Sequence, residues 1–279
     1  MADFPRTKIE DVSVSRLVMG TNWWLGFSHT SKAKDDYIKA TMGRREIADI
    51  MEVFLNAGVD ALIGIRPDEM LANAIRDAED RAGRKVLSIT TPHLDISDTP
   101  GALSNTERIL DDAKATGAFA CWPHQQTTDA LLDRTTRTIR DMDKYCAMIR
   151  ERGMLPGLST HMPEGIKYAD DSGLDVASYI QLYNAVGFLM PLEVDWVHKI
   201  IWEARKPVIA IKPLAAGRLA PLPGLAFAWS TIRECDMVAV GTSTPDEARE
   251  VIEISLAIQE RRRPDFELQK TRSKASVEG

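Results

Sequence analysis

The chain has 279 residues with 44% apolar and 27% charged side chains, which is the size and balance of one ordinary globular domain. Its 35 basic and 41 acidic residues are scattered and sum to a net charge of −6, which excludes the one-sided basic surface that nucleic-acid binding requires. No apolar run is long enough to span a membrane, the start has no secretory pattern, and three widely spaced cysteines favour a reducing compartment. We therefore expect a cytoplasmic protein with a small-molecule substrate and neither nucleic acid nor membrane as partner; whether it is a homo-oligomer stays open.

Short apolar runs rich in β-branched residues alternate with longer segments of helical period. The predicted strands cover residues 14–21, 59–65, 85–91, 119–122, 155–161, 179–183, 208–214 and 237–242. The predicted helices cover residues 44–57, 68–82, 103–116, 128–152, 192–204 and 245–260, with shorter ones at 164–169 and 225–234. Capping residues agree with these bounds, since Thr244 precedes Pro245 at one helix start and Gly83 follows one helix and precedes a strand.

Eight strands in strict alternation with helices favour a parallel sheet covered by helices, and about 250 residues suit a (β/α)8 TIM barrel. A doubly wound sheet is the alternative, but no glycine-rich phosphate turn follows the first strand. We predict an α/β fold with a single barrel domain over residues 1–279, closed at its bottom by an N-terminal β-hairpin around residues 9–14. Residues 264–279 are predicted to form a flexible tail, and the long polar loop 25–43 a lid.

In such barrels the chemistry lies at the carboxyl ends of the strands and in the loops that follow. His93, His124 and His161 stand just beyond the third, fourth and fifth predicted strands, which are neighbours. Their imidazoles could therefore converge on one side of the mouth. His29 lies in the loop 25–43, and His198 lies within a helical segment, where a structural role is expected.

The strand ends also carry a series of motifs. These are Val14-Ser15-Arg16-Leu17, Met19-Gly20-Thr21, Ala57-Gly58-Val59-Asp60, Cys121-Trp122-Pro123, Gly157-Leu158-Ser159, Gln181-Leu182-Tyr183-Asn184, Pro213-Leu214-Ala215-Ala216-Gly217-Arg218-Leu219 and Gly241-Thr242-Ser243-Thr244-Pro245. In these motifs and their order, the chain resembles the aldo-keto reductase superfamily from residue 14 to about residue 255. The resemblance implies a barrel of the aldo-keto reductase type.

The resemblance also implies a catalytic tetrad of Asp, Tyr, Lys and His, of which Asp60 matches the first. Ile65 stands where the Tyr is expected, Pro92 or at best Thr91 where the Lys is expected, and Cys121 where the His is expected. Because an isoleucine cannot donate a proton, the reduction mechanism of the family would lack its acid. We therefore expect a divergent member with different chemistry or none.

The resemblance implies a nicotinamide cofactor as well. The positions that it assigns to NADP(H) are Ser159, Gln181, Gly217, Arg218, Thr242 and Ser243. The first two would hold the carboxamide and the other four the phosphates, where the backbone N–H groups of a helix start suit an anion. The aromatic residue that stacks on the nicotinamide is replaced by Ile211 or Lys212. The alternative is that these loops persist only because they close the barrel.

Three imidazoles with an open coordination position form a catalytic site for zinc, iron or manganese. His93, His124 and His161 are therefore predicted to bind a divalent metal, with Asp60 or Glu164 as an added carboxylate. The ion would polarise a carbonyl or activate a water in place of the missing Tyr. Without a metal, one histidine would act as a general base, or each would make ordinary loop hydrogen bonds.

Two kinds of cationic side chain are predicted at the rim. Lys212 ends the seventh strand, where a lysine can form a Schiff base or bind an anion, and a salt bridge to Asp60 is the alternative. Arg66 and Arg218 lie in rim loops and could hold a carboxylate or phosphate with two hydrogen bonds, or else pair with surface acids. The aromatic residues expected to wall the pocket are Trp23, Trp24 and Trp122.

From these residues we predict a small-molecule enzyme. Its catalytic candidates are Asp60, His93, His124, His161 and Lys212. The expected reaction is metal-assisted or histidine-mediated proton transfer, of lyase, isomerase or hydrolase type, on a small sugar-like or keto substrate. Two alternatives stay open: an NAD(P)H-dependent oxidoreductase with a non-standard proton donor, and a barrel that binds a metabolite without catalysis.

Overall fold

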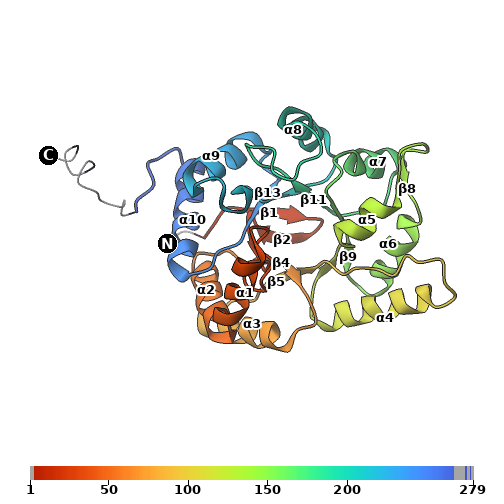
Figure 1. Cartoon of the computed structure of the whole chain (residues 1–279), viewed down its shortest axis with the longest axis horizontal. Coiled ribbons are helices and arrows are strands. Elements are labelled where there is room, and N and C mark those ends of the chain that lie inside the picture. Colours follow the sequence, from red (N-terminus) through yellow and green to blue (C-terminus); the bar gives the residue numbers. More distant parts are fainter. Residues whose placement is uncertain (1–2, 267–273, 275–276, 278–279) are drawn as a thin grey trace.

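The computed structural model describes residues 3–266 together with 274 and 277, so most of the predicted tail 264–279 lies outside the described residues. A ring of parallel strands forms the centre, and helices surround it (Figure 1). The strands of the ring are β3 (Leu17–Gly20), β4 (Ala61–Ile65), β5 (Leu87–Thr90), β6 (Ala120–Cys121), β9 (Leu155–Pro156), β10 (Leu158–Thr160), β11 (Tyr179–Leu182), β12 (Val208–Ile211) and β13 (Met237–Val240). The helices are α1 (Lys32–Thr41), α2 (Arg44–Asn56), α3 (Glu69–Ala82), α4 (Ala102–Ala115), α5 (Gln125–Leu131), α6 (Met142–Glu151), α7 (Glu164–Ser172), α8 (Val194–Glu203), α9 (Pro221–Thr231) and α10 (Pro245–Gln259).

The ring closes through the fifth predicted strand, which one residue divides into β9 and β10. β9 pairs with β6, and β10 pairs with β11, so the two ends of the sheet are halves of the same strand. The dividing residue is Gly157, where an added Cβ would lie 2.3 Å from Nε1 of Trp122. Glycine is therefore required here because the Trp122 ring occupies the space of a side chain. The predicted (β/α)8 barrel is confirmed.

Side chains alternate along each strand between the barrel interior and the surrounding helices. Val18 and Ile180 lie in the cluster that fills the interior, whereas Met19 lies in the larger cluster between strands and helices. An antiparallel hairpin of β1 (Arg6–Ile9) and β2 (Val12–Ser15) closes the lower end of the barrel. Its Ile9 and Val14 are fully buried and belong to the interior cluster. The predicted N-terminal hairpin is confirmed, and the opposite end of the barrel is the mouth.

Two predicted segments differ from the structure. The helix predicted over 128–152 is two helices, α5 and α6, joined by a short hairpin of β7 (Leu132–Asp133) and β8 (Thr138–Ile139). Asp133 accepts the backbone N–H groups of Thr135 and Thr136, and such a turn competes with the helix. The loop predicted over 25–43 contains the helix α1, which Ser31 caps by accepting the N–H of Lys34.

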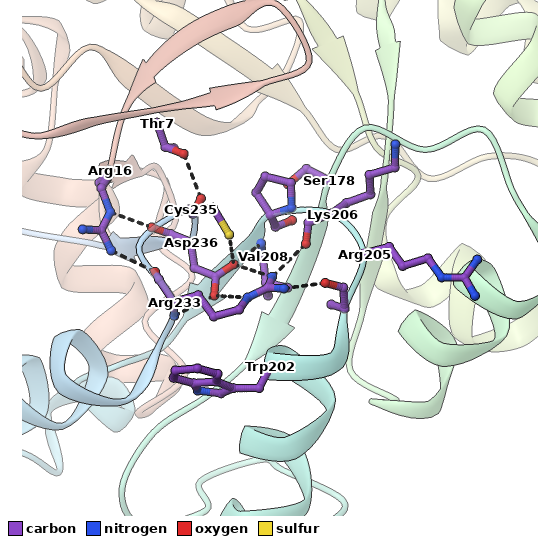
Figure 2. Close-up of polar contacts among 12 residues, drawn as sticks. Thr7, Arg16, Ser178, Trp202, Arg205, Lys206, Val208, Arg233, Cys235 and Asp236 are labelled. Carbon is purple, nitrogen blue, oxygen red and sulfur yellow. Dashed lines mark hydrogen bonds and ion pairs between the residues drawn. The ribbon is translucent and has the colours of Figure 1, made fainter.

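A polar network ties the lower ends of β12 and β13 together (Figure 2). Asp236 is fully buried, forms a 2.7 Å ion pair with Arg233, and accepts the backbone N–H of Val208. Arg16 donates to the carbonyl groups of Asp236 and Arg233, which links this network to β3. The Arg233 guanidinium also donates to the carbonyl of Lys206. These bonds satisfy backbone groups at the end of the barrel away from the mouth.

Among the described residues, no helix is both long and apolar enough to cross a membrane.

Candidate active site

A cavity of about 980 Å³ opens at the mouth of the barrel. Its walls come from the residues at and just after the carboxyl ends of β3, β4, β5, β10, β12 and β13. Trp23, Phe27 and Ser28 of the segment between β3 and α1 also line it. The cavity therefore lies where a barrel of this kind carries its chemistry.

Four histidines and one lysine line this cavity. They are His29, His93, His124, His161 and Lys212. His93 follows β5, His124 follows β6 and caps α5, His161 follows β10, and Lys212 follows β12. The structure thus brings together the three histidines and the lysine that the sequence assigns to neighbouring strand ends, and it adds His29 from the preceding loop.

His93 and His124 contact each other directly. Their ring centroids are 4.0 Å apart and the ring planes are inclined by 39°. Nδ1 of His124 accepts the N–H of Gln126, so in the neutral ring the proton resides on Nε2. Burial, and then the positive charges of His93, Arg66 and Lys212, lower the pKa of His124 to about 4. This imidazole is therefore neutral at pH 7 in the free protein.

The backbone at His161 is fixed by hydrogen bonds to Asp129 of α5. The Asp129 carboxylate accepts the backbone N–H of His161 at 3.2 Å and the hydroxyl of Thr160 at 2.5 Å. Burial, and then the charges of Lys212 and of neighbouring histidines, lower the pKa of His161 to about 4. Sequence reasoning missed Asp129, because an acid within a short helix has no pattern that marks it as a partner of the next strand end.

Lys212 is half-buried and has no hydrogen-bond or ion-pair partner in the described part of the chain. Among residues 3–266, no hydrogen bond or ion pair engages its Nζ, and burial lowers the pKa of Lys212 to about 8. Its backbone has φ of 59°, in the left-handed region that residues other than glycine rarely adopt. The alternative of a salt bridge to Asp60 is wrong, since that carboxylate is engaged elsewhere.

Asp60 and Glu164 do not reach the cavity. Asp60 precedes β4, so it lies at the lower end of the barrel, where it pairs with Arg6 at 2.8 Å and accepts the N–H of Ser15. The Glu164 carboxylate pairs with Arg134 at 2.6 Å on the outer side of α7. Neither lines the mouth, and the expectation that they support the histidines does not agree with these positions.

The predicted metal site is not assembled in this arrangement. In the described part of the chain, no group of three or more His, Cys, Asp or Glu side chains is placed to hold a metal ion. The charges that act on His124 and His161 are positive, and a dication would be repelled by Lys212 and Arg66. His93, His124 and His161 therefore do not fit a divalent metal, and we derive no step through one.

The residues assigned to NADP(H) divide into two groups. Ser159, Gly217 and Thr242 line the cavity. Gln181 is fully buried, and since Ile180 faces the barrel interior, the alternation of the strand turns Gln181 toward the helices. Arg218 lies on the Phe188 ring, 4.0 Å from its centroid, and it is not a lining residue.

The helix start assigned to a phosphate already holds a carboxylate. The Ser243 N–H donates to Oε2 of Glu247 at 2.6 Å, and Thr244 accepts the N–H of Glu247. Pro245 supplies no N–H, and Asp246 adds a second acid to the first turn. A phosphate here would have to displace a carboxylate from a negatively charged turn. The described residues therefore do not fit NADP(H) in the way that the resemblance implies.

The three positions that the resemblance assigns to Tyr, Lys and His lie in two places. Ile65 and Pro92 line the cavity. Cys121 is fully buried in the layer between strands and helices, where burial raises the pKa of its thiol far above the usual range. Trp23 lines the cavity, Trp122 fills the barrel interior, and Trp24 is buried with its Nε1–H donated to the carbonyl of Thr242.

No family model and no curated protein matches the sequence. Among solved structures, a candidate aldo-keto reductase of Pseudomonas aeruginosa has a TM-score of 0.64 at 14% identity, with 93% of this chain and 99% of that chain covered. An aldose reductase of Giardia lamblia has a TM-score of 0.53 at 12% identity, covering 99% and 92%. A D-allulose 3-epimerase of Methylomonas also has a TM-score of 0.53 at 12% identity, covering 94% and 99%. At these identities the similarity concerns the fold, which is a TIM barrel like that of the aldo-keto reductases.

Proposed function

We propose that the chain is an enzyme that binds a small anionic carbonyl compound, a keto acid or a sugar phosphate, in the mouth of the barrel. Its histidines would move protons to and from the carbon next to that carbonyl. The observation that carries this proposal is the gathering of His93, His124, His161 and Lys212 in one cavity, where the charges acting on the pKa of the three histidines are positive. Asp112, Glu247 and Glu250 also line the cavity, but they are not among the main charges that shift the pKa of these histidines. Such a site favours a negatively charged ligand.

The low pKa values support a proton-transfer role. His124 and His161 are neutral at pH 7 in the free protein because their pKa is about 4. A bound carboxylate or phosphate would favour the charged imidazolium and raise the pKa of both rings toward neutrality. A ring whose pKa lies near the working pH is the most effective general acid or base. Ligand binding would therefore prepare the site for catalysis.

Arg66 is the side chain best suited to hold the anionic group. It is exposed at the rim, lines the cavity, and lies 5.0 Å from the centroid of the Phe27 ring. In the described part of the chain it forms no ion pair with an acid, and its charge lowers the pKa of His93 and His124. Its planar guanidinium can bind a carboxylate or phosphate with two parallel hydrogen bonds.

The segment between β3 and α1 covers one side of the cavity. Asp35 of α1 accepts the N–H of Ser28 at 2.8 Å and its hydroxyl at 2.6 Å, which fixes this segment over the mouth. Trp23 and Phe27 contribute apolar surface to the cavity. A cavity with an apolar wall excludes water and strengthens the electrostatic interactions inside it.

The test is exchange of carbon-bound protons. We would incubate the protein in D2O with pyruvate and, separately, with dihydroxyacetone phosphate, and follow the loss of each C–H signal by NMR. Exchange above the buffer rate is expected for at least one of the two anions and not for acetone, which has no anionic group. His161→Ala and His124→Ala should each lower the exchange rate by about 100-fold.

His198→Ala is the matched control, because His198 stacks on Tyr183 at α8 and does not line the cavity. It should leave the rate unchanged. Exchange at the buffer rate with both anions would contradict the proposal. If pyruvate or dihydroxyacetone phosphate bound without exchange, the chain would instead be a barrel that binds a metabolite without catalysis.

A further inference from the structure

One group in the cavity has no role in the proton transfer described so far. Nζ of Lys212 has no hydrogen bond or ion pair among residues 3–266, although the residue is half-buried. Lysines removed from water are ordinarily paired with an acid, and Asp60, the partner that the sequence offers, pairs with Arg6 at the other end of the barrel. An unpaired amine at a strand end therefore lowers the free energy of unfolding, and a function would explain why it is present.

The backbone holds this amine at the mouth by an unusual conformation. Lys212 has φ of 59° and precedes Pro213, whereas a residue before proline ordinarily adopts an extended conformation. The Lys212 carbonyl accepts the N–H of Ala215, which fixes a turn directly after β12. Glycine would adopt this conformation without strain, whereas lysine adopts it at a cost in backbone energy that a role of its side chain would explain.

Two imidazoles line the same cavity as Lys212 and lie within the reach of its charge. Its positive charge lowers the pKa of His161 and of His124, and both rings line the same cavity. The cavity thus combines a nucleophilic amine, two proton carriers and, at its rim, the guanidinium of Arg66. These are the parts that condensation of an amine with a carbonyl requires.

We propose that Lys212 forms a Schiff base with the carbonyl carbon of the anionic substrate, an inference that rests on the proposed function and adds its covalent step. A neutral imidazole first takes one proton from the Lys212 ammonium. The neutral amine then attacks the carbonyl carbon, a C–N bond forms, and the carbonyl π electrons move to the oxygen, which takes that proton back from the imidazolium. The nitrogen gives a second proton to the imidazole, which passes it to the hydroxyl, and the C–O bond breaks as water leaves. A protonated imine remains, so an ammonium and a carbonyl yield an iminium and one water without any change in oxidation state.

The iminium explains why proton transfer would follow. Its positive charge withdraws electrons from the adjacent carbon more strongly than a carbonyl does, which makes the C–H bond next to it more acidic. The neutral imidazole of His161 or His124 then accepts that proton. Since burial lowers the pKa of Lys212 to about 8, a useful fraction of the amine is neutral and nucleophilic at pH 7 to 8.

The test is reductive trapping. We would treat the wild-type protein with pyruvate and sodium cyanoborohydride, which is stable from pH 6 to pH 8, digest it with trypsin, and locate the alkylated lysine by mass spectrometry. Trypsin does not cleave before proline, so Lys206 and Lys212, each followed by proline, remain in one peptide that ends at Arg218. Lys206 is exposed and serves as a control for non-specific reduction within the same peptide.

We expect alkylation of Lys212 to be at least tenfold above that of Lys206. The alkylation of Lys212 should fall by about tenfold or more when the trapping is done at pH 6 instead of pH 8, because the amine becomes protonated. Equal labelling of the two lysines, or no labelling of Lys212 with either pyruvate or dihydroxyacetone phosphate, would overturn the Schiff base.

Lys212→Met separates this inference from the proposed function. We expect its proton exchange to fall by at least 100-fold, while Lys144→Met, at an exposed position on α6, leaves the rate unchanged. Exchange that persists in Lys212→Met, when wild-type protein shows it, would overturn the Schiff base and leave the histidine mechanism standing. Trapping at Lys212 without any exchange in the wild type would support the Schiff base and contradict the proton transfer.

Discussion

The imidazole rings of His93 and His124 lie 4.0 Å apart between their centroids, at the ends of two adjacent strands. The charge of His93 lowers the pKa of His124, that of Arg66 lowers the pKa of both rings, and among the described residues no acid is a main cause of either shift. Contact between two such rings is stable because both are neutral at pH 7. The pair will accept positive charge only when an anion enters the cavity.

Acid should therefore destabilise the free protein through its histidines. His124 and His161 have a pKa of about 4 when folded, below the 6.5 of an unfolded histidine, so the unfolded chain binds more protons between these values. The free energy of unfolding then falls as pH falls from about 6.5 to 4, by on the order of 1 kcal/mol for each ring at pH 5, because both rings are partly exposed and water screens their charges. Urea unfolding at pH 7 and pH 5 would measure this, and His124→Gln with His161→Gln should reduce the fall. An equal fall in that double variant would assign acid sensitivity to other groups.

Replacement of Arg66 should weaken anion binding. In Arg66→Gln, the dissociation constant for pyruvate should rise about tenfold, since a charge-assisted hydrogen bond contributes on the order of 1.5 kcal/mol. Calorimetric titration would measure it. Arg218→Gln is the control, because that guanidinium stacks on Phe188 and donates to the carbonyl of Ala215 outside the lining of the cavity. If the two variants lost equal affinity, general charge rather than a specific contact would hold the ligand.

Asp129→Asn should slow proton exchange without preventing binding. The asparagine amide offers one oxygen where the carboxylate accepts both the Thr160 hydroxyl and the His161 N–H, so the His161 loop would shift. We expect the exchange rate at saturating pyruvate to fall about tenfold while the dissociation constant changes less than twofold, as for a positioning residue. The pH dependence of the rate should shift as well, because the His161 ring moves relative to Lys212. A variant that lost only stability would leave this profile unchanged.

NADPH should bind weakly or not at all. Titration should give no saturable change in tryptophan fluorescence, to which Trp23 in the cavity wall would respond. Glu247→Gln removes the carboxylate that accepts the Ser243 N–H, so any residual affinity for NADPH should increase in this variant. Tight, saturable binding to the wild type would show that Glu247 moves aside and would restore the nicotinamide alternative.

The buried ion pair beneath the barrel should matter more than an exposed one. Asp236→Ala leaves Arg233 without its partner and the N–H of Val208 without its acceptor, and we expect a loss of about 3 kcal/mol in the free energy of unfolding. Asp246→Ala removes an exposed pair with Arg249 and should change this free energy by less than about 1 kcal/mol. Denaturant unfolding of both variants would compare them. Similar losses in the free energy of unfolding of the two variants would mean that water reaches the polar network of Figure 2.

The sequence predicts the barrel well because alternation of apolar strands and amphipathic helices is a signal spread over the whole chain. It also identifies the strand ends, so His93, His124, His161 and Lys212 lie at the mouth where they were expected. Position within a strand is harder to predict. Asp60 was assigned to the mouth, but β4 begins one residue later, so this carboxylate lies at the opposite end of the barrel.

Side-chain direction and long-range partners are also beyond the sequence pattern. Gln181 is in the expected strand, but the alternation that starts at Tyr179 turns it toward the helices. The carboxylate of Glu247 at a helix start, and that of Asp129 beneath His161, depend on contacts that only the folded chain shows. The hairpin that divides the helix predicted over 128–152 depends on local turn bonds at Asp133 that periodicity does not detect.

The close approach of Trp122 to Gly157 constrains how this barrel can vary. An alanine at position 157 would overlap the indole, so it becomes acceptable only when position 122 carries a smaller ring or an aliphatic side chain. That smaller side chain, with glycine kept at 157, would leave an empty space in the barrel interior. Each single replacement is thus harmful in its own way while the double replacement restores the packing. In a selection of barrel variants that still fold, the two positions would be recovered as a correlated pair.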